Sequence, residues 1–239
     1  MDLVSVIIPT YNRFELLNHC IKSVINGTYE NVEVIVVNDC STDPRYYNGE
    51  LEKYSEMNMK MKIKIIHLPV NNRQKYNTPS AQGMTRQEGI NVATGQWIAF
   101  LDDDDFYLPD KLSTHMAFIK EHNCLFSSTN MYNVVHNSIK LNGLDMIVKG
   151  IHHKNKSIPM IFTYELISRT NYVLNSTVIV HKSICDIVGS FLLIACEDYN
   201  YWLRILKHTP CYFLNLPLTY YSMNNPKHYS YDGSYRPLN

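Results

Sequence analysis

The sequence predicts an α/β fold in which a mostly parallel central sheet is flanked by helices. Short β-branched segments alternate with amphipathic ones through the N-terminal half, an alternation typical of right-handed strand–helix–strand units. The segment 32–37 is almost continuously apolar, as expected for a strand buried on both faces of a parallel sheet. Another apolar segment, 97–101, runs directly into four consecutive aspartates at 102–105.

Local signals define the elements of the N-terminal half. Apolar residues at positions 14, 17, 21 and 24 have helical spacing, and Gly27 and Gly95 follow the ends of their helices. Asp43 before Pro44 has the form of an N-cap followed by proline at the first helical position. The expected order is a strand at 3–8 stopped by Pro9, a helix from Phe14, strands at 32–37 and 61–68, a polar loop at 71–80, a helix at 82–93 and a strand at 97–101.

The C-terminal half has a less regular pattern. Apolar positions predict a helix around 112–119 and a helix over 197–208 with Trp202, Leu203 and Leu206 on its buried side. Strands are expected at 125–135 and 178–180, and from Pro210 onward, with a hairpin or irregular loop at 137–150. No internal repeat or Gly/Ser-rich linker divides the chain, so we expect a single domain over 1–239.

Composition excludes several classes of protein. Lys+Arg and Asp+Glu both number 22, and the absence of a basic stripe argues against a nucleic acid partner. No apolar run approaches the ~20 residues of a transmembrane helix, and no signal-peptide pattern opens the chain. The six cysteines have no metal-ligand spacing, which favours reduced thiols. We therefore expect a cytoplasmic protein, with a peripheral position at a membrane as the alternative.

The aspartate run indicates the chemistry. Four adjacent carboxylates repel one another unless water or a cation surrounds them. Mg²⁺ and Mn²⁺ take oxygen ligands and commonly lie between carboxylates and the phosphates of a substrate. In parallel sheets, ligands bind beyond the carboxyl ends of the strands, where this run and the polar residues 10–12 and 38–39 are expected. No dinucleotide fingerprint or P-loop is present, so the run is interpreted as a metal–diphosphate site.

Three motif blocks carry a resemblance to a known family. In order they are 4–13 (VSVIIPTYNR), 34–43 (VIVVNDCSTD) and 95–105 (GQWIAFLDDDD), followed by LPDKL at 108–112. Together they resemble family 2 glycosyltransferases of the GT-A fold over the first half of the chain. The resemblance implies a nucleotide-sugar-binding half at 1–108 and an acceptor-binding half, with a C-terminal tail, at 109–239.

The resemblance implies an inverting, metal-dependent transfer. The donor would be a nucleoside-diphosphate sugar, with a UDP-sugar as the default, and the acceptor a hydroxyl of a glycan, a lipid-linked sugar or a protein. The metal would be Mn²⁺ or Mg²⁺. The gene product lacks the Gln-x-x-Arg-Trp motif of processive polymerases, which favours the addition of single residues. A homodimer is a candidate assembly of the protein.

The same resemblance assigns residues to roles. Asp102, Asp103 and Asp104 correspond to the family's DXD motif, and Asp198 with Glu197 to its Glu-Asp pair, in which the aspartate is the base. A general base has to face the acceptor hydroxyl. Burial against Trp202 would raise the pKa of Asp198, whereas the N-terminus of the helix would lower it, and the sequence leaves the net direction open. The nucleotide-binding candidates are Pro9, Thr10, Tyr11, Arg13, Asp39, Arg86, Asp102 and Asp103; the metal-binding candidates are Asp102, Asp104 and, from the tail, His228.

Alternatives stay open for the function and for individual residues. Asp39 also suits a turn, Asp105 a structural role, and His228 a surface tail. Two other functions are compatible with the motifs: a non-catalytic relative that binds nucleotide sugars or glycans, and a nucleotidyltransferase, which also uses carboxylates and Mg²⁺.

Overall fold

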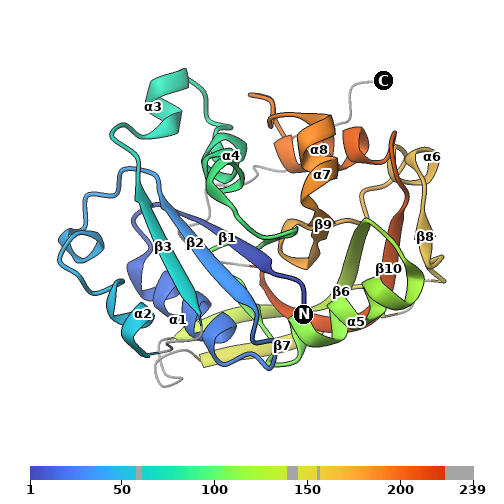
Figure 1. The fold of residues 1–239 in the computed structure, drawn as a ribbon, viewed down its shortest axis with the longest axis horizontal. Helices are drawn as coiled ribbons and strands as arrows, with labels where there is room; N and C mark the ends of the chain where they lie inside the picture. Colours follow the sequence, from blue (N-terminus) through green and yellow to red (C-terminus); the bar gives the residue numbers. More distant parts are fainter. Residues whose placement is uncertain (58–60, 139–144, 155–156, 224–239) are drawn as a thin grey trace.

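The computed structural model describes residues 1–57, 61–138, 145–154 and 157–223 (Figure 1). The strands are β1 (Val4–Thr10), β2 (Val32–Asn38), β3 (Lys62–His67), β4 (Trp97–Phe100), β5 (Phe106–Tyr107), β6 (Phe126–Ser138), β7 (Asp145–Ile151), β8 (Ile161–Phe162), β9 (Ile179–His181) and β10 (Cys211–Ser222). The helices are α1 (Phe14–Ile25), α2 (Lys53–Met57), α3 (Asn72–Tyr76), α4 (Gln82–Val92), α5 (Lys111–His122), α6 (Tyr164–Ile167), α7 (Lys182–Val188) and α8 (Glu197–Ile205), with 3₁₀ turns η1 (Pro44–Tyr46) and η2 (Asn175–Thr177). These elements confirm the α/β class.

The described strands form one sheet in the order β3-β2-β1-β4-β9-β6-β10-β5, with β7 on β6 and β8 on β10. The expected parallel pairing holds for β3, β2, β1 and β4. The rest of the sheet is mixed, because β9 is antiparallel to both β4 and β6 whereas β10 runs parallel to β6. Strand β1 continues through Pro9, which pairs with Val37 of β2. Pairing with β4 ends at Ile7, so the missing N–H of Pro9 interrupts no ladder on that side.

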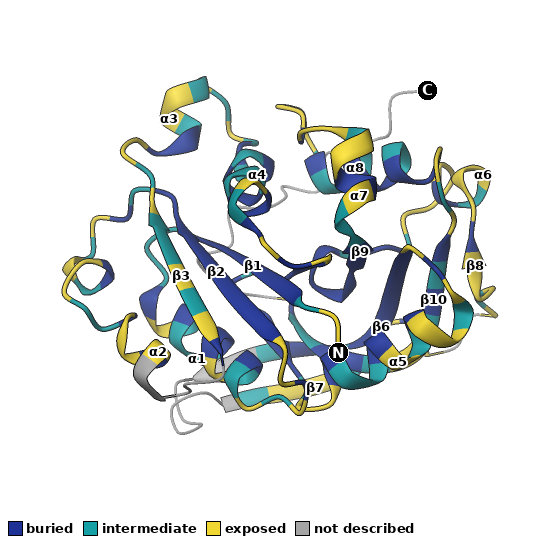
Figure 2. Cartoon of the chain, in the orientation of Figure 1, coloured by how far each residue is buried: buried dark blue, intermediate teal, exposed yellow. Residues whose placement is uncertain are grey.

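Helices cover both faces of the parallel part of the sheet (Figure 2). Because side chains alternate along a strand, Val4, Val6 and Ile8 of β1 face the core that contains α1 and α5. Ile7 faces the opposite core, with α4, α7 and α8. Every residue of β1 and β2 is buried, which explains why apolar residues dominate both sequences.

Two further expectations differ from the structure in detail. The segment 71–80, predicted to be a polar loop, contains the short helix α3, whose N-cap Asn71 accepts a hydrogen bond from the backbone N–H of Arg73. The helix predicted over 197–208 ends at Ile205. β6 and β7 pair as an antiparallel hairpin, one of the two alternatives for 137–150, although residues 139–144 lie outside the described part. The six cysteines are free thiols, and no helix among the described residues has the length and apolarity to cross a membrane.

A buried carboxylate supports the end of the sheet opposite the aspartate run. Glu33 of β2, 5% exposed, accepts hydrogen bonds from the Ser5 hydroxyl, from the backbone N–H groups of Thr94 (2.6 Å) and Gly95 (3.0 Å), and from the Thr94 hydroxyl (3.0 Å). Burial raises the pKa of the Glu33 carboxyl. The hydrogen bonds together lower it by more, so the pKa of Glu33 lies below its ordinary value.

Glu33→Gln is expected to lower the free energy of unfolding at pH 7 by about 1–3 kcal/mol, because a neutral amide cannot accept all these hydrogen bonds. A depressed folded-state pKa contributes stability above the unfolded-state pKa of about 4.3, and this contribution is lost as the pH falls through the folded-state pKa. Urea unfolding at pH 7 and at lower pH should show the difference between the proteins shrinking on acidification. A constant difference would contradict the role of the charge.

Candidate active site

The aspartate run forms a tight turn at the end of β4. The backbone N–H of Asp105 donates to the carbonyl of Asp102 at 3.0 Å, which closes a four-residue turn. Asp103, Asp104 and Asp105 are buried, whereas the Asp102 side chain is 27% exposed. The run is therefore a packed part of the sheet edge, and Asp102 is its accessible member.

Arg13 neutralises two of the buried carboxylates. It stands at the N-cap position of α1 and forms ion pairs with Asp103 and, at 3.0 Å, with Asp104. Burial raises the pKa of Asp103 to about 7; Arg13 opposes this and the neighbouring Asp104 adds to it. Arg13 was expected to bind nucleotide; in this structure its guanidinium lies against the aspartate run.

Asp105 anchors the run to β10. Its Oδ1 accepts a hydrogen bond from the backbone N–H of Ser222 at 2.9 Å, and the Ser222 hydroxyl donates to the carbonyl of Asp104. Burial, together with Asp104 and Asp102, raises the pKa of Asp105 well above its ordinary value. Through its hydrogen bond from Ser222, the Asp105 carboxyl holds the turn 102–105 against β10.

Asp102 is held from two sides. Its Oδ1 accepts from Nη2 of Arg86 at 2.7 Å and from Nδ2 of Asn175 at 2.8 Å. Its backbone N–H donates to the Ser176 hydroxyl at 3.0 Å. Among the described residues both side-chain hydrogen bonds to Asp102 go to Oδ1, which leaves Oδ2 as the candidate oxygen for a ligand.

Arg86 joins the aspartate run to the start of α8. The buried guanidinium of this α4 residue contacts Asp102 with one terminal nitrogen and Oε1 of Glu197 with the other, at 2.9 Å. Burial would lower the pKa of Arg86, but Asp102 and Glu197 outweigh it and raise the pKa. The helices approach closely because α4 has Gly83 here: a Cβ at Gly83 would lie 2.7 Å from Cγ of Glu197.

Asp198 lies beside this ion pair and is partly exposed. Its Oδ1 accepts from the backbone N–H of Tyr199 at 2.7 Å. Burial and the neighbouring Glu197 raise the pKa of Asp198 to about 6, and Arg86 opposes them. A carboxylate that titrates near neutrality is suited to accept and return a proton.

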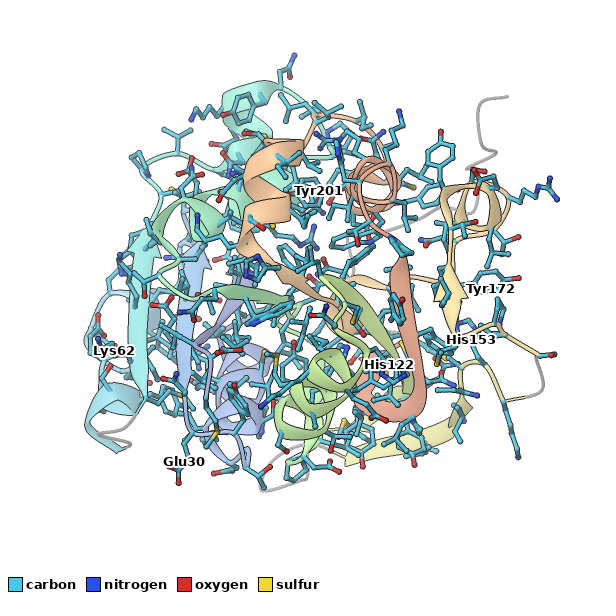
Figure 3. The ribbon with its side chains drawn as sticks, turned by 45° about the vertical axis from the view of Figure 1, so that its right-hand side comes forward. Glu30, Lys62, His122, His153, Tyr172 and Tyr201 are labelled. Atoms are coloured by element: carbon cyan, nitrogen blue, oxygen red, sulfur yellow. The ribbon has the colours of Figure 1, made fainter. Side chains whose placement is uncertain are left out.

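Aromatic packing fixes the position of α8. The ring of Tyr201, labelled in Figure 3, stacks on Phe191 with ring centroids 4.0 Å apart. Trp202 is fully buried and packs edge-on against Phe100 of β4, at 5.5 Å. The strand that carries the aspartate run and the helix that carries Glu197 and Asp198 thus share one core.

The first motif block borders the same site. The Thr10 hydroxyl lies 2.9 Å from that of the buried Tyr46, which also accepts from the backbone N–H of Arg13, and Thr10 hydrogen-bonds Asp103. Pro9 is buried in β1, and Tyr11 is partly exposed just beyond it. The end of β1 and the aspartate run are therefore brought together, as the sequence predicts.

Asp39 is placed at the end of β2 and contacts the segment around α3. Its carboxylate accepts from the backbone N–H of Asn72 at 2.8 Å and from Nδ2 of Asn71 at 3.1 Å. Burial raises the pKa of Asp39, and the hydrogen bond from Asn72 opposes the rise. Its expected contact with a nucleotide base stays a prediction.

Of the three expected metal ligands, the structure describes Asp102 and Asp104. Among the described residues, no three His, Cys, Asp or Glu side chains are grouped to hold a metal ion. His228 lies outside the described residues. Asp102 and Asp104 are both in the turn, but their carboxylates contact Arg86 and Arg13, respectively.

Sequence reasoning missed three supporting residues, Tyr46, Asn175 and Ser176. Asn175 and Ser176 belong to η2, a polar triplet between the apolar residues 172–174 and 178–180. That interruption was the available signal. Nothing in the spacing shows that the triplet returns to the aspartate run.

The chain is similar to known proteins in sequence and in fold. The family model "Glycosyl transferase family 2" matches residues 5–171. The chain is 30% identical over 225 residues to Escherichia coli WfaP, named as a UDP-Glc:alpha-D-GlcNAc-diphosphoundecaprenol beta-1,3-glucosyltransferase, with 94% of this chain and 78% of the relative covered. It is 40% identical over 126 residues to an uncharacterized glycosyltransferase of Rickettsia bellii, which covers 53% of this chain and 16% of that protein.

The fold has counterparts among solved structures. S. aureus TarS (residues 1–349) in complex with UDP-GlcNAc superposes with a TM-score of 0.69 at 22% identity, over 98% of this chain and 62% of the TarS chain. The chain thus spans less than two thirds of TarS and a small part of the Rickettsia protein, but most of WfaP.

Proposed function

The chain belongs to glycosyl transferase family 2, and from this premise we propose that it transfers a sugar from a nucleoside-diphosphate sugar to an acceptor hydroxyl, with inversion. One observation carries the proposal: the buried Arg86 joins Asp102 at the end of β4 to Glu197 at the start of α8. Asp102, a candidate for binding the nucleotide sugar, and the helix start that carries the candidate base Asp198 are thereby held on the two sides of one guanidinium.

The donor is proposed to be a UDP-sugar and the acceptor a lipid-linked sugar. WfaP is named for UDP-Glc and for a GlcNAc-diphosphoundecaprenol substrate, and TarS was solved with UDP-GlcNAc. In this chain Thr10, Tyr11 and Asp39 would contact the nucleoside, and Oδ2 of Asp102 a polar group of the donor.

Asp198 is proposed as the general base. It is partly exposed next to Glu197, and its pKa of about 6 leaves it ionised at neutral pH. In that state the carboxylate can take the proton of an acceptor hydroxyl as the hydroxyl attacks the donor sugar. Glu197 holds the first turn of α8 against Arg86 and so positions Asp198.

We propose that a divalent cation binds at the aspartate run. Carboxylates outnumber cations here. The guanidiniums of Arg13 and Arg86 face five carboxyl groups, those of Asp102, Asp103, Asp104, Glu197 and Asp198. Asp102 and Asp104 would hold Mn²⁺ or Mg²⁺ through hard oxygen ligands. Such a cation supplies Lewis-acid stabilisation of the departing diphosphate.

Asp104→Ala is expected to reduce release of UDP from a UDP-sugar and acceptor mixture by about 10²-fold or more, because charge on the leaving diphosphate loses its counter-ion. A chelator should do the same to the unmodified protein. UDP release is followed across a donor panel, and Mn²⁺ binding by electron paramagnetic resonance. Asp110→Ala, which removes an exposed carboxylate just beyond the run, is the matched control.

Three outcomes separate the alternatives. Full turnover in chelator, with unchanged Mn²⁺ binding by Asp104→Ala, would contradict the metal site. Tight UDP binding without turnover on any donor or acceptor would favour a non-catalytic relative. Consumption of a nucleoside triphosphate with a sugar phosphate would identify a nucleotidyltransferase.

A further inference from the structure

Lys111, the first residue of α5, is buried away from the proposed catalytic residues. It is 1% exposed, and its Nζ lies 2.9 Å from the carbonyl of Thr177, 3.0 Å from the Thr129 hydroxyl and 3.0 Å from Nδ1 of His115. These partners are all neutral acceptors, and burial lowers the pKa of Lys111 well below its ordinary value. No carboxylate of the described residues pairs with this amine. Burying an amine without such a partner is costly, so the contacts that Lys111 makes call for an explanation.

The Thr177 carbonyl is the last one of η2. This turn has only three residues and no side-chain cap, so it cannot be stable by its own hydrogen bonds. Lys111 holds one end of it, and the Thr219 hydroxyl of β10 donates to the Ser176 carbonyl at 3.3 Å. The conformation of η2 therefore depends on donors from α5 and β10.

The opposite side of η2 contacts the aspartate run. Nδ2 of Asn175 donates to Oδ1 of Asp102, and the Ser176 hydroxyl accepts from the Asp102 backbone N–H. Asn175 is 5% exposed, and its Oδ1 has no hydrogen-bond partner among the described residues. Asn175 is thus retained in the core although only its Nδ2 is satisfied, and that group orients Asp102.

We propose that Lys111 is a positioning residue for donor binding: it fixes η2 through the Thr177 carbonyl, and η2 fixes the backbone and carboxylate of Asp102. The inference rests on the proposed function, in which Oδ2 of Asp102 contacts the nucleotide sugar. Lys111 itself does not touch the ligand. Its effect is transmitted through one three-residue turn.

A control variant in the hydrogen-bond network of Lys111 and His115 distinguishes a positioning role of Lys111 from a purely structural one. Ser127 continues the network on the side away from η2, where its hydroxyl lies 2.8 Å from Nε2 of His115 and donates to the Tyr212 carbonyl at 2.7 Å. Ser127→Ala removes buried hydrogen bonds and leaves the donor to Thr177 in place. It should lower the melting temperature without changing ligand affinity.

The test combines Lys111→Met, Asn175→Ala and their double variant. Calorimetric titration with UDP in the presence of Mn²⁺ should give a dissociation constant raised about fivefold or more for each single variant. In the double variant the dissociation constant should rise by far less than the product of the two single fold-changes, because both substitutions remove contacts of the same connection from Lys111 to Asp102. Lys111→Met should also speed amide hydrogen exchange at Asp102, whereas Ser127→Ala should not.

The outcomes are separable from those that test the function. If the unmodified protein binds no UDP, the proposed function fails, and the exchange rate at Asp102 still decides the role of Lys111. Unchanged exchange at Asp102 in Lys111→Met, or UDP affinities that multiply in the double variant, would overturn the inference. If Lys111→Met does not fold, Lys111→Gln, which keeps an amide donor, is judged by the same exchange measurement against Ser127→Ala.

Discussion

Asp198→Asn is expected to reduce sugar transfer by about 10²- to 10⁴-fold while UDP binds as tightly as to the unmodified protein. The substitution keeps the size of the side chain and an oxygen that can accept from the Tyr199 N–H, so the start of α8 should keep its geometry. It removes the ability to accept a proton. Initial rates of UDP release and calorimetric UDP affinity, measured on the same preparations, check the two parts.

The pH dependence of transfer gives a second check on Asp198. Its pKa of about 6 is set by burial and Glu197, which raise it, and by Arg86, which lowers it, with Asp102 as the remaining charged neighbour. A base must be ionised to act, so the rate should fall as the pH drops below about 6. Asp186→Asn, which changes an exposed carboxylate of α7, should keep both the rate and this profile. Transfer by Asp198→Asn at the unmodified rate would remove Asp198 from the role of base.

The strands and helices of the N-terminal half could be predicted because each carries its own local signal. β1 and β2 are mostly apolar, since both of their faces are buried, and α1 buries the periodic residues Phe14, Leu17, Ile21 and Val24. α3 was missed because its five residues include no apolar period. Its start depends on the Asn71 cap and on the contact from Asp39 to Asn72.

The mixed part of the sheet could not be predicted, because strand neighbours there are far apart in the sequence. β9 lies between β4 and β6, although nothing in its three residues specifies either partner. The same holds for the site. The family resemblance indicated Asp102, Arg86 and Glu197 as separate candidates, whereas the ion pairs that join them exist only after α4, β4 and α8 pack together.

Arg13 shows how a motif residue can have a role that its position does not reveal. It follows the end of β1 and was expected to approach the nucleotide, yet its guanidinium contacts Asp103 and Asp104. The reason is electrostatic: a turn of buried carboxylates needs a cation nearby, and burial already raises the pKa of Asp103 to about 7 despite Arg13. A nucleotide contact by Arg13 stays a prediction.

Arg86→Met is expected to lower the free energy of unfolding at pH 7 by about 3–5 kcal/mol, because it leaves the carboxylates of Glu197 and Asp102 partly buried without their cation. The Glu197 and Asp102 side chains are 11% and 27% exposed, respectively, so the penalty should be greater for Glu197. UDP binding should weaken as well, since Asp102 keeps only Asn175 on its Oδ1. Urea unfolding and calorimetric titration measure the two effects.

Two comparisons identify the charge as the cause of the Arg86→Met defect. Removing the charge of Glu197 as well, in Arg86→Met/Glu197→Gln, should recover part of the stability deficit relative to the unmodified protein. Arg169→Met, which removes an exposed arginine, should change stability by about 0.5 kcal/mol or less. A deficit that Glu197→Gln does not reduce would instead indicate lost packing of the arginine side chain between α4 and α8. The bridge between the two sides of the proposed site would then be steric, and the charge on Arg86 would have to act on the ligand alone.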